Sequence, residues 1–115
     1  MPIRIVTTPI TVEELRQVAA EEFGDFVKGV VDIARAIMAL GGELHADEEA
    51  RLLQDGSGQA NLWGINLYPD REGDERVEFD SMINVRPSQG NRSRGVEDPA
   101  VQRQIQDIVR SLVIS

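Results

Sequence analysis

Residues 25–42, DFVKGVVDIARAIMALGG, decide the fold because this segment reads in two ways. Its apolar residues recur at helical spacing, yet the run FVKGVVDI is rich in β-branched residues and contains a glycine, which weakens a helix and suits a strand. We therefore predict two strands, roughly residues 26–33 and 37–45, joined near residues 34–36. The alternative is one long second helix, which would leave a smaller sheet.

The amino-terminal side of this segment predicts a strand followed by a helix. The short β-branched run IRIV, residues 3–6, indicates a first strand or an extended arm. Thr11 then stands three residues before Glu14, the spacing of a capping box, in which each side chain bonds a backbone N–H group at the start of a helix. Apolar residues follow at helical spacing and Gly24 can supply the left-handed residue after them, so we expect a helix over residues 12–23.

The carboxyl-terminal side predicts a hairpin. NLWGINLYP, residues 61–69, and RVEFDSMINVR, residues 76–86, alternate apolar and polar side chains and are bounded by turn-forming residues, so we expect two antiparallel strands. Trp63 falls on the apolar face of the first strand and is expected in the core. The opposite face of the hairpin is polar and would combine four side chains: Asn66, Tyr68, Asp80 and Asn84.

The last helix is marked by its start and by its apolar face. Asp98 is a good N-cap residue, and Pro99 fits the first helical position. Five apolar residues form one stripe along the helix: Val101, Ile105, Ile108, Val109 and Leu112. Together these elements predict an α+β fold, a mainly antiparallel sheet of four or five strands with the amino- and carboxyl-terminal helices packed on one face.

Composition narrows the classes of protein and partner. The 115 residues, 41% of them hydrophobic, suffice for a single compact domain spanning residues 1–115. A formal net charge of −8 argues against a nucleic-acid partner and favours basic or cationic ones. The absence of cysteine excludes a thiolate nucleophile and a Cys-based zinc site. We expect a cytoplasmic protein without a membrane partner, because the sequence has neither a leader-like start nor a long apolar run.

The segment GGELHADEEARLL, residues 41–53, places the only histidine among acidic side chains. If it is extended, four side chains share a face: Glu43, His45, Asp47 and Glu49. If it is helical, His45 shares a face with Glu49 by i,i+4 spacing and Glu43 pairs with Asp47. Carboxylate and imidazole ligands suit manganese, magnesium or iron, so Glu43, His45 and Asp47 are the metal candidates. A histidine beside a carboxylate can also act as a general acid or base. The alternative is a solvated acidic edge with a structural His45.

A second polar segment, FDSMINVRPSQGNRSRGVEDP, covers residues 79–99. Its loop carries Asn91, Arg92 and Arg94 just before a helix start, an arrangement that can hold a carboxylate or phosphate through guanidinium and backbone N–H groups. The alternative is an internal network, because Asp98 can cap the helix itself and the arginines have many carboxylates nearby. The segment lacks the spacing of a phosphate-binding P-loop.

The phrases GGELHADEEARLL, LWGINLYPD and EFDSMINVRPSQGNRSRGVEDP together resemble a small family of uncharacterised bacterial and archaeal proteins, classed as a domain of unknown function. The resemblance covers nearly the full length of the chain. It implies a self-contained prokaryotic domain, and it carries over neither an activity nor a site residue.

Three hypotheses on function follow from the residues. The favoured one is a binding or regulatory domain, for a small anion or a protein partner, whose polar pocket is formed by the HADEE and NRSR segments. It predicts the convergence of six side chains: His45, Asp47, Asp80, Asn84, Arg92 and Arg94. The sequence alone does not choose between this hypothesis and the other two.

The second hypothesis is a metal-dependent hydrolase acting on a small anionic substrate. Its catalytic candidates are His45, Asp47 and Asp80, with Glu48 as a further acid, while Asn91, Arg92 and Arg94 would bind the anion. A divalent metal is compatible with the sequence, although no residue pattern requires one. The third hypothesis is an oligomeric interaction module in which a sheet face or edge pairs with a second copy of the chain.

Overall fold

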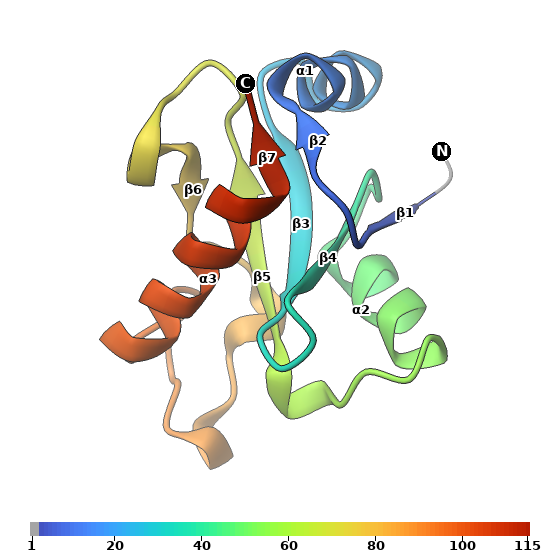
Figure 1. The fold of residues 1–115 in the computed structure, drawn as a ribbon. Helices are drawn as coiled ribbons and strands as arrows, with labels where there is room; N and C mark the ends of the chain where they lie inside the picture. The colour runs from blue at the N-terminus through green and yellow to red at the C-terminus, as the bar shows by residue number, and fades with distance from the viewer. Residues whose placement is uncertain (1–2) are drawn as a thin grey trace.

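The computed structural model describes residues 3–115 and has an α+β fold built on a five-stranded antiparallel sheet (Figure 1). The strand order is β1-β4-β3-β5-β6. The bounds of these strands are β1 Arg4–Val6, β3 Val27–Asp32, β4 Ile37–Leu40, β5 Leu62–Leu67 and β6 Val77–Glu78. Two further short strands, β2 (Ile10–Thr11) and β7 (Val113–Ile114), pair in parallel with each other.

The helices and short 3-10 turns connect these strands. The α-helices are α1 Val12–Glu21, α2 His45–Gln54 and α3 Pro99–Leu112. The 3-10 turns are η1 Gln59–Asn61, η2 Gly73–Arg76, η3 Met82–Asn84 and η4 Pro87–Gln89. Within residues 3–115, no helix combines the length and the apolar character needed to cross a membrane.

The deciding segment forms the β3–β4 hairpin, as predicted. Asp32 closes the turn, since its Oδ1 accepts hydrogen bonds from the backbone N–H groups of Ala34 (2.8 Å) and Arg35 (3.0 Å). The second strand is shorter than predicted. It ends at Leu40 because Gly41 adopts a positive φ of 93°, which turns the chain away from the sheet before α2 begins.

The two outer helices begin as their sequence signals predict. Thr11 caps α1 by accepting a hydrogen bond from the Glu14 N–H (3.0 Å), and Asp98 caps α3 by accepting one from the Ala100 N–H (2.9 Å). Helix α1 ends at Glu21, slightly before the predicted Phe23. The first residue of each helix is therefore set by a hydrogen bond to its own N-cap side chain.

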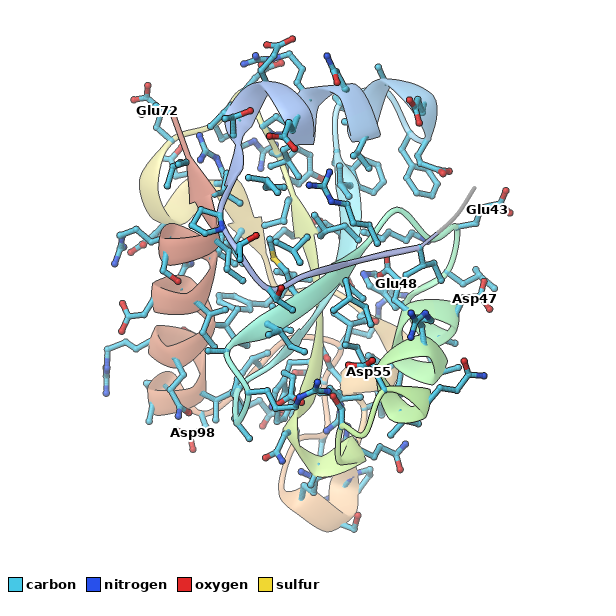
Figure 2. The ribbon with its side chains drawn as sticks, turned by 45° about the vertical axis from the view of Figure 1, so that its right-hand side comes forward. Glu43, Asp47, Glu48, Asp55, Glu72 and Asp98 are labelled. Carbon is cyan, nitrogen blue, oxygen red and sulfur yellow. The ribbon has the colours of Figure 1, made fainter. Side chains whose placement is uncertain are left out.

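The sheet separates two apolar clusters, and α2 and α3 flank it on opposite sides (Figures 1 and 2). The larger cluster combines α1 and α3 residues with the β3 side chains Val27 and Val31, and it includes the buried Trp63, which confirms the core prediction for that residue. The smaller cluster combines Val30 with Leu52 of α2. Alternation along β3 thus gives each face of the sheet its own helical cover.

The strand predicted over residues 76–86 is largely wrong. Only Val77–Glu78 pairs as β6, and the chain then leaves the sheet and forms η3. The side chain of Asn84 takes the pairing position instead: its Oδ1 accepts from the Gly64 N–H (2.8 Å), and its Nδ2 donates to the Gly64 carbonyl (2.9 Å). Gly64 allows the segment before Asn84 to pack closely on β5, because a Cβ at position 64 would lie 2.5 Å from the Ser81 side chain.

Candidate functional site

A pocket of about 430 Å³ opens on the α2 side of the sheet, between the first turn of α2, the strands β3, β5 and β6, and η3. We call it the α2 pocket. Its polar lining comprises Lys28, His45, Asn66, Tyr68, Glu78, Asp80, Ser81 and Arg94. Its apolar lining comprises Phe26, Leu44, Ala46, Met82 and Ile83. The volume falls in the range of small-molecule sites in proteins.

The floor of the α2 pocket is a row of three side chains in register across the sheet. Lys28 of β3 pairs with Asn66 of β5, and Asn66 pairs with Glu78 of β6. Directly opposed residues on neighbouring strands point to the same face and lie about 5 Å apart. The row therefore runs from a cation through an amide to a carboxylate.

His45 is the first residue of α2 and closes one side of the pocket. Its Nε2 lies 2.8 Å from the Ile65 carbonyl oxygen, so Nε2 carries a proton and donates it. Burial is the main cause that lowers the pKa of His45, and the positive charge of Lys28 adds to it, whereas the Ile65 carbonyl and the Asn66 side chain act in the opposite direction. In the neutral imidazole, Nδ1 is consequently a lone-pair acceptor.

Asn66 carries the one feature of the pocket that packing does not explain. The residue is only 7% exposed, and its Nδ2 donates to Glu78 Oε1 at 2.9 Å and, at a longer 3.4 Å, to the Asp80 carbonyl. Its Oδ1 is buried without a hydrogen-bond partner among residues 3–115. Neutral His45 cannot supply the missing proton, because its Nδ1 is an acceptor. A buried unpaired acceptor is unfavourable unless a donor reaches it.

The β6 side of the pocket is acidic. Glu78 Oε1 also accepts from the Tyr68 hydroxyl at 3.3 Å, and the Tyr68 ring stacks on Phe26 with a centroid distance of 5.5 Å. Burial and the nearby Glu78 carboxylate raise the pKa of Tyr68, so its hydroxyl stays a donor. Asp80 Oδ1 accepts from Arg94 Nε at 2.7 Å. This ion pair brings the NRSR loop to the pocket.

Three of the six side chains that the binding hypothesis groups together line this pocket: His45, Asp80 and Arg94. Asn84 lies behind the wall, fully buried and bonded to the Gly64 backbone and to the Arg94 carbonyl (2.9 Å). Asp47 is exposed and points away from the molecule (Figure 2), and Arg92 is not part of the lining. The two polar segments therefore meet at the pocket through His45, Asp80 and Arg94, and the other three side chains of the predicted group do not line it.

The metal candidates do not face one another. Glu43 and Asp47 are exposed and point outward (Figure 2), while His45 faces the pocket. In the part of the chain from residue 3 to 115, no group of three or more His, Asp or Glu side chains is placed to hold a metal ion. A metal role for these residues stays a prediction.

Glu48 is a buried acid outside the pocket lining. It is fully buried; its Oε2 accepts from the Gly42 N–H at 2.9 Å, and its Oε1 has no partner within residues 3–115. Burial is the main cause that raises its pKa to about 9, so the carboxyl is protonated at neutral pH. Glu48 lies one turn before the buried Leu52, and that helical spacing was the sequence signal for its burial.

The predicted anion-binding loop already binds a carboxylate of the chain itself. The backbone N–H groups of Arg92 and Ser93 donate to Glu97 Oε2 at 2.6 and 2.8 Å, and these hydrogen bonds lower the pKa of Glu97. Asn91 is buried, and its Oδ1 accepts from the Glu97 N–H at 2.8 Å. The Asn91 Nδ2 group donates to three carbonyls, those of Asn84, Ser93 and Gly95. These loop groups therefore form the internal network that the sequence left open.

Sequence reasoning missed Lys28. It is the only lysine of the chain, and it lines the same pocket as the only histidine. Its Nζ lies 5.0 Å from the Phe23 ring centroid, and it forms no ion pair within residues 3–115. The sequence feature that could have indicated Lys28 is a single positively charged residue inside a β-branched run.

The comparisons with known proteins identify the family of the chain but no activity. The model of a family described as protein of unknown function, DUF5674, matches residues 4–112. The chain belongs to the DUF5674 family. This membership confirms the resemblance to an uncharacterised family. Neither the curated proteins nor the solved structures contain a match. DUF5674 membership assigns no activity, so a functional argument has to start from the geometry of the α2 pocket.

Proposed function

We propose that this protein is a binding domain that holds a small polar molecule in the α2 pocket. The observation that carries the proposal is the Asn66 Oδ1 atom, a buried acceptor without a partner among residues 3–115, in a pocket lined by both polar segments. Native proteins pair nearly all such atoms, and an exception calls for a missing donor. A bound ligand supplies that donor.

The polar lining is held in place before any ligand arrives. The Ile65 carbonyl orients His45, the Glu78 carboxylate orients Asn66, and Asp80 orients Arg94. Groups that are already positioned lose little conformational freedom when a ligand binds, which favours affinity. An arrangement of this kind is typical of small-molecule sites, where a few convergent polar groups set orientation.

The rim of the α2 pocket is apolar and open. Leu44 is 56% exposed and Met82 is 65% exposed, and both line the pocket. Exposed apolar side chains next to a polar floor suit a ligand that has an apolar part as well as hydrogen-bonding groups. The unbranched Met82 side chain can adapt its shape to such a part.

Thermal unfolding with a library of small metabolites tests the proposal. A ligand that binds only the folded state raises the free energy of unfolding by about 2.7 kcal/mol at one hundred times its Kd. We expect a shift that is lost in Arg94→Ala and kept in Arg92→Ala, a matched control from the same loop that does not line the pocket. The library includes Mn²⁺ and Mg²⁺, since a shift with either ion that disappears in His45→Ala would favour the hydrolase hypothesis instead.

Two results would contradict the proposal. One is the absence of any shift across the library. The other is a shift that Arg94→Ala and Asn66→Ala leave unchanged, because the ligand would then bind outside the α2 pocket. An ordered water that alone satisfies Asn66 Oδ1 would give the first result.

A further inference from the structure

The charges of the α2 pocket are separated across the sheet. Lys28 lies on β3, whereas Glu78 and Asp80 lie on and after β6, with Asn66 of β5 between them. Arg94 is paired with Asp80, so it offsets one of the two carboxylates. With neutral His45, the charges of the lining sum to zero. A ligand with a single net charge therefore gains little from the pocket as a whole, while a dipolar one meets a complementary group at each end.

The β3 side can receive an anionic group. Leu44, at the N-cap of α2, makes no side-chain capping hydrogen bond, and Leu44, His45 and Ala46 all line the pocket. The Asp47 N–H group already donates to the Leu44 carbonyl at 3.1 Å, so the donors that the uncapped start offers are those of His45 and Ala46, and the helix dipole adds positive potential there. Lys28, in the row directly beside Asn66, contributes a full positive charge.

The β6 side can receive a group that donates hydrogen bonds. Asn66 Oδ1 is the unpartnered buried acceptor, and it is independent of the helix start. Glu78, the next residue in the row, adds a carboxylate, and Asp80 lies two residues further along the chain. An ammonium group has three donors and a positive charge, which match one amide oxygen and two nearby carboxylates.

We propose that the ligand of the α2 pocket is a free α-amino acid with an apolar side chain. Its carboxylate faces Lys28 and the first turn of α2, and its side chain lies between Leu44 and Met82. Its ammonium group donates to Glu78 and, by displacing the side chains that cover it, to Asn66 Oδ1. The two charged groups of an amino acid share one carbon atom, which suits a row whose neighbours are about 5 Å apart. This assignment rests on the proposed binding function.

A matched set of three probes tests the assignment. All amino acids are first compared by thermal unfolding, and calorimetry then compares L-leucine with 3-methylbutylamine, which lacks the carboxylate, and with 4-methylpentanoate, which lacks the ammonium group. We expect each analogue to bind about tenfold more weakly or worse, because each loses one charge-assisted set of hydrogen bonds. An analogue that binds as tightly as L-leucine would overturn the zwitterion assignment.

Two variants locate the two charged groups of the ligand. Lys28→Met keeps the apolar stem and should weaken L-leucine binding by about tenfold, while leaving 3-methylbutylamine binding unchanged. Glu78→Gln should weaken L-leucine in the same way and leave 4-methylpentanoate unchanged or bound more tightly. Glu72→Gln is the matched control, since Glu72 is exposed and lies far from α2 (Figure 2). Equal effects of Glu72→Gln and Glu78→Gln would contradict the assignment.

The experiments distinguish failure of the amino-acid assignment from failure of the binding function. If no amino acid binds but another small molecule gives a shift that depends on Arg94, the amino-acid assignment fails and the binding function stands. If no compound gives a shift that depends on Arg94 or on Asn66, both fail.

Discussion

The loop of residues 86–97 and the α2 pocket are both rich in polar side chains, but they use them differently. In the loop, the buried amide of Asn91 donates to three carbonyls and accepts from the Glu97 N–H, so its capacity is filled by the chain itself. In the pocket, the buried amide of Asn66 keeps an unpaired Oδ1. The difference shows that a dense polar sequence can be satisfied entirely within the chain, and that the pocket, unlike the loop, keeps hydrogen-bonding capacity that a ligand can use.

Alanine substitution of two buried asparagines gives the largest expected effect among the substitutions compared at one pH. Asn84→Ala leaves the Gly64 N–H, the Gly64 carbonyl and the Arg94 carbonyl without their partner, so we expect a loss of about 3 kcal/mol or more in the free energy of unfolding. Asn66→Ala removes one short hydrogen bond, to Glu78, and should cost about 1 kcal/mol. Urea denaturation measures both. Equal losses in the free energy of unfolding would mean that the Asn66 and Asn84 amides stabilise the fold equally, which would contradict the comparison.

The sequence predicted those parts of the fold that local chemistry determines. The caps at Thr11 and Asp98 and the β-branched segment at residues 26–33 carry their own signals. The prediction of a strand over residues 76–86 was largely wrong because of a contact between residues far apart in the sequence. The Asn84 side chain, and not a backbone strand, bonds the Gly64 backbone on β5. No pattern in the local sequence predicts that a side chain will take the place of a backbone partner.

The site was predictable in part for the same reason. Strand alternation placed Asn66 and Tyr68 on a polar face with Asp80, and all three line the α2 pocket. His45 and Asp47 share a face only in an extended chain. In a helix, residues two apart point in nearly opposite directions, so α2 turns Asp47 to solvent while His45 enters the pocket.

Glu48 extends the comparison to a second buried polar group with an unpaired atom. Its folded pKa of about 9 lies above its ordinary 4.5, so the folded protein keeps a proton that the unfolded chain releases between these values. The free energy of unfolding should therefore fall as pH rises from 4.5 to 9, by at most about 1.4 kcal/mol per pH unit. Glu48→Gln removes this group and should flatten the dependence.

Chemical denaturation at a series of pH values measures the Glu48 effect. The matched control is Glu43→Gln, because Glu43 is an exposed neighbour that points away from the molecule (Figure 2). Parallel curves for wild type and Glu48→Gln would show that Glu48 is ionised in the folded state.

His45 gives the smallest effect, with the opposite sign. Burial lowers its folded pKa below the ordinary 6.5, so the unfolded chain takes up a proton that the folded protein resists. Stability from this group is complete above pH 6.5 and falls as pH decreases from 6.5 toward the folded pKa. Because Glu48 acts in the other direction over part of that range, the Glu48→Gln variant is the background in which to measure it.

We expect Glu48→Gln to lose stability below pH 6.5, and the double variant with His45→Gln to lose less. The single histidine also allows a direct measurement, since its ring signals can be followed by NMR without assignment. A midpoint at or above 6.5 would contradict the lowered pKa of His45. The imidazolium carries a proton on Nδ1, and the Asn66 side chain is among the groups that favour this charged form. Protonation would therefore fill the open acceptor of the pocket and make Asn66 resemble Asn91 of the loop.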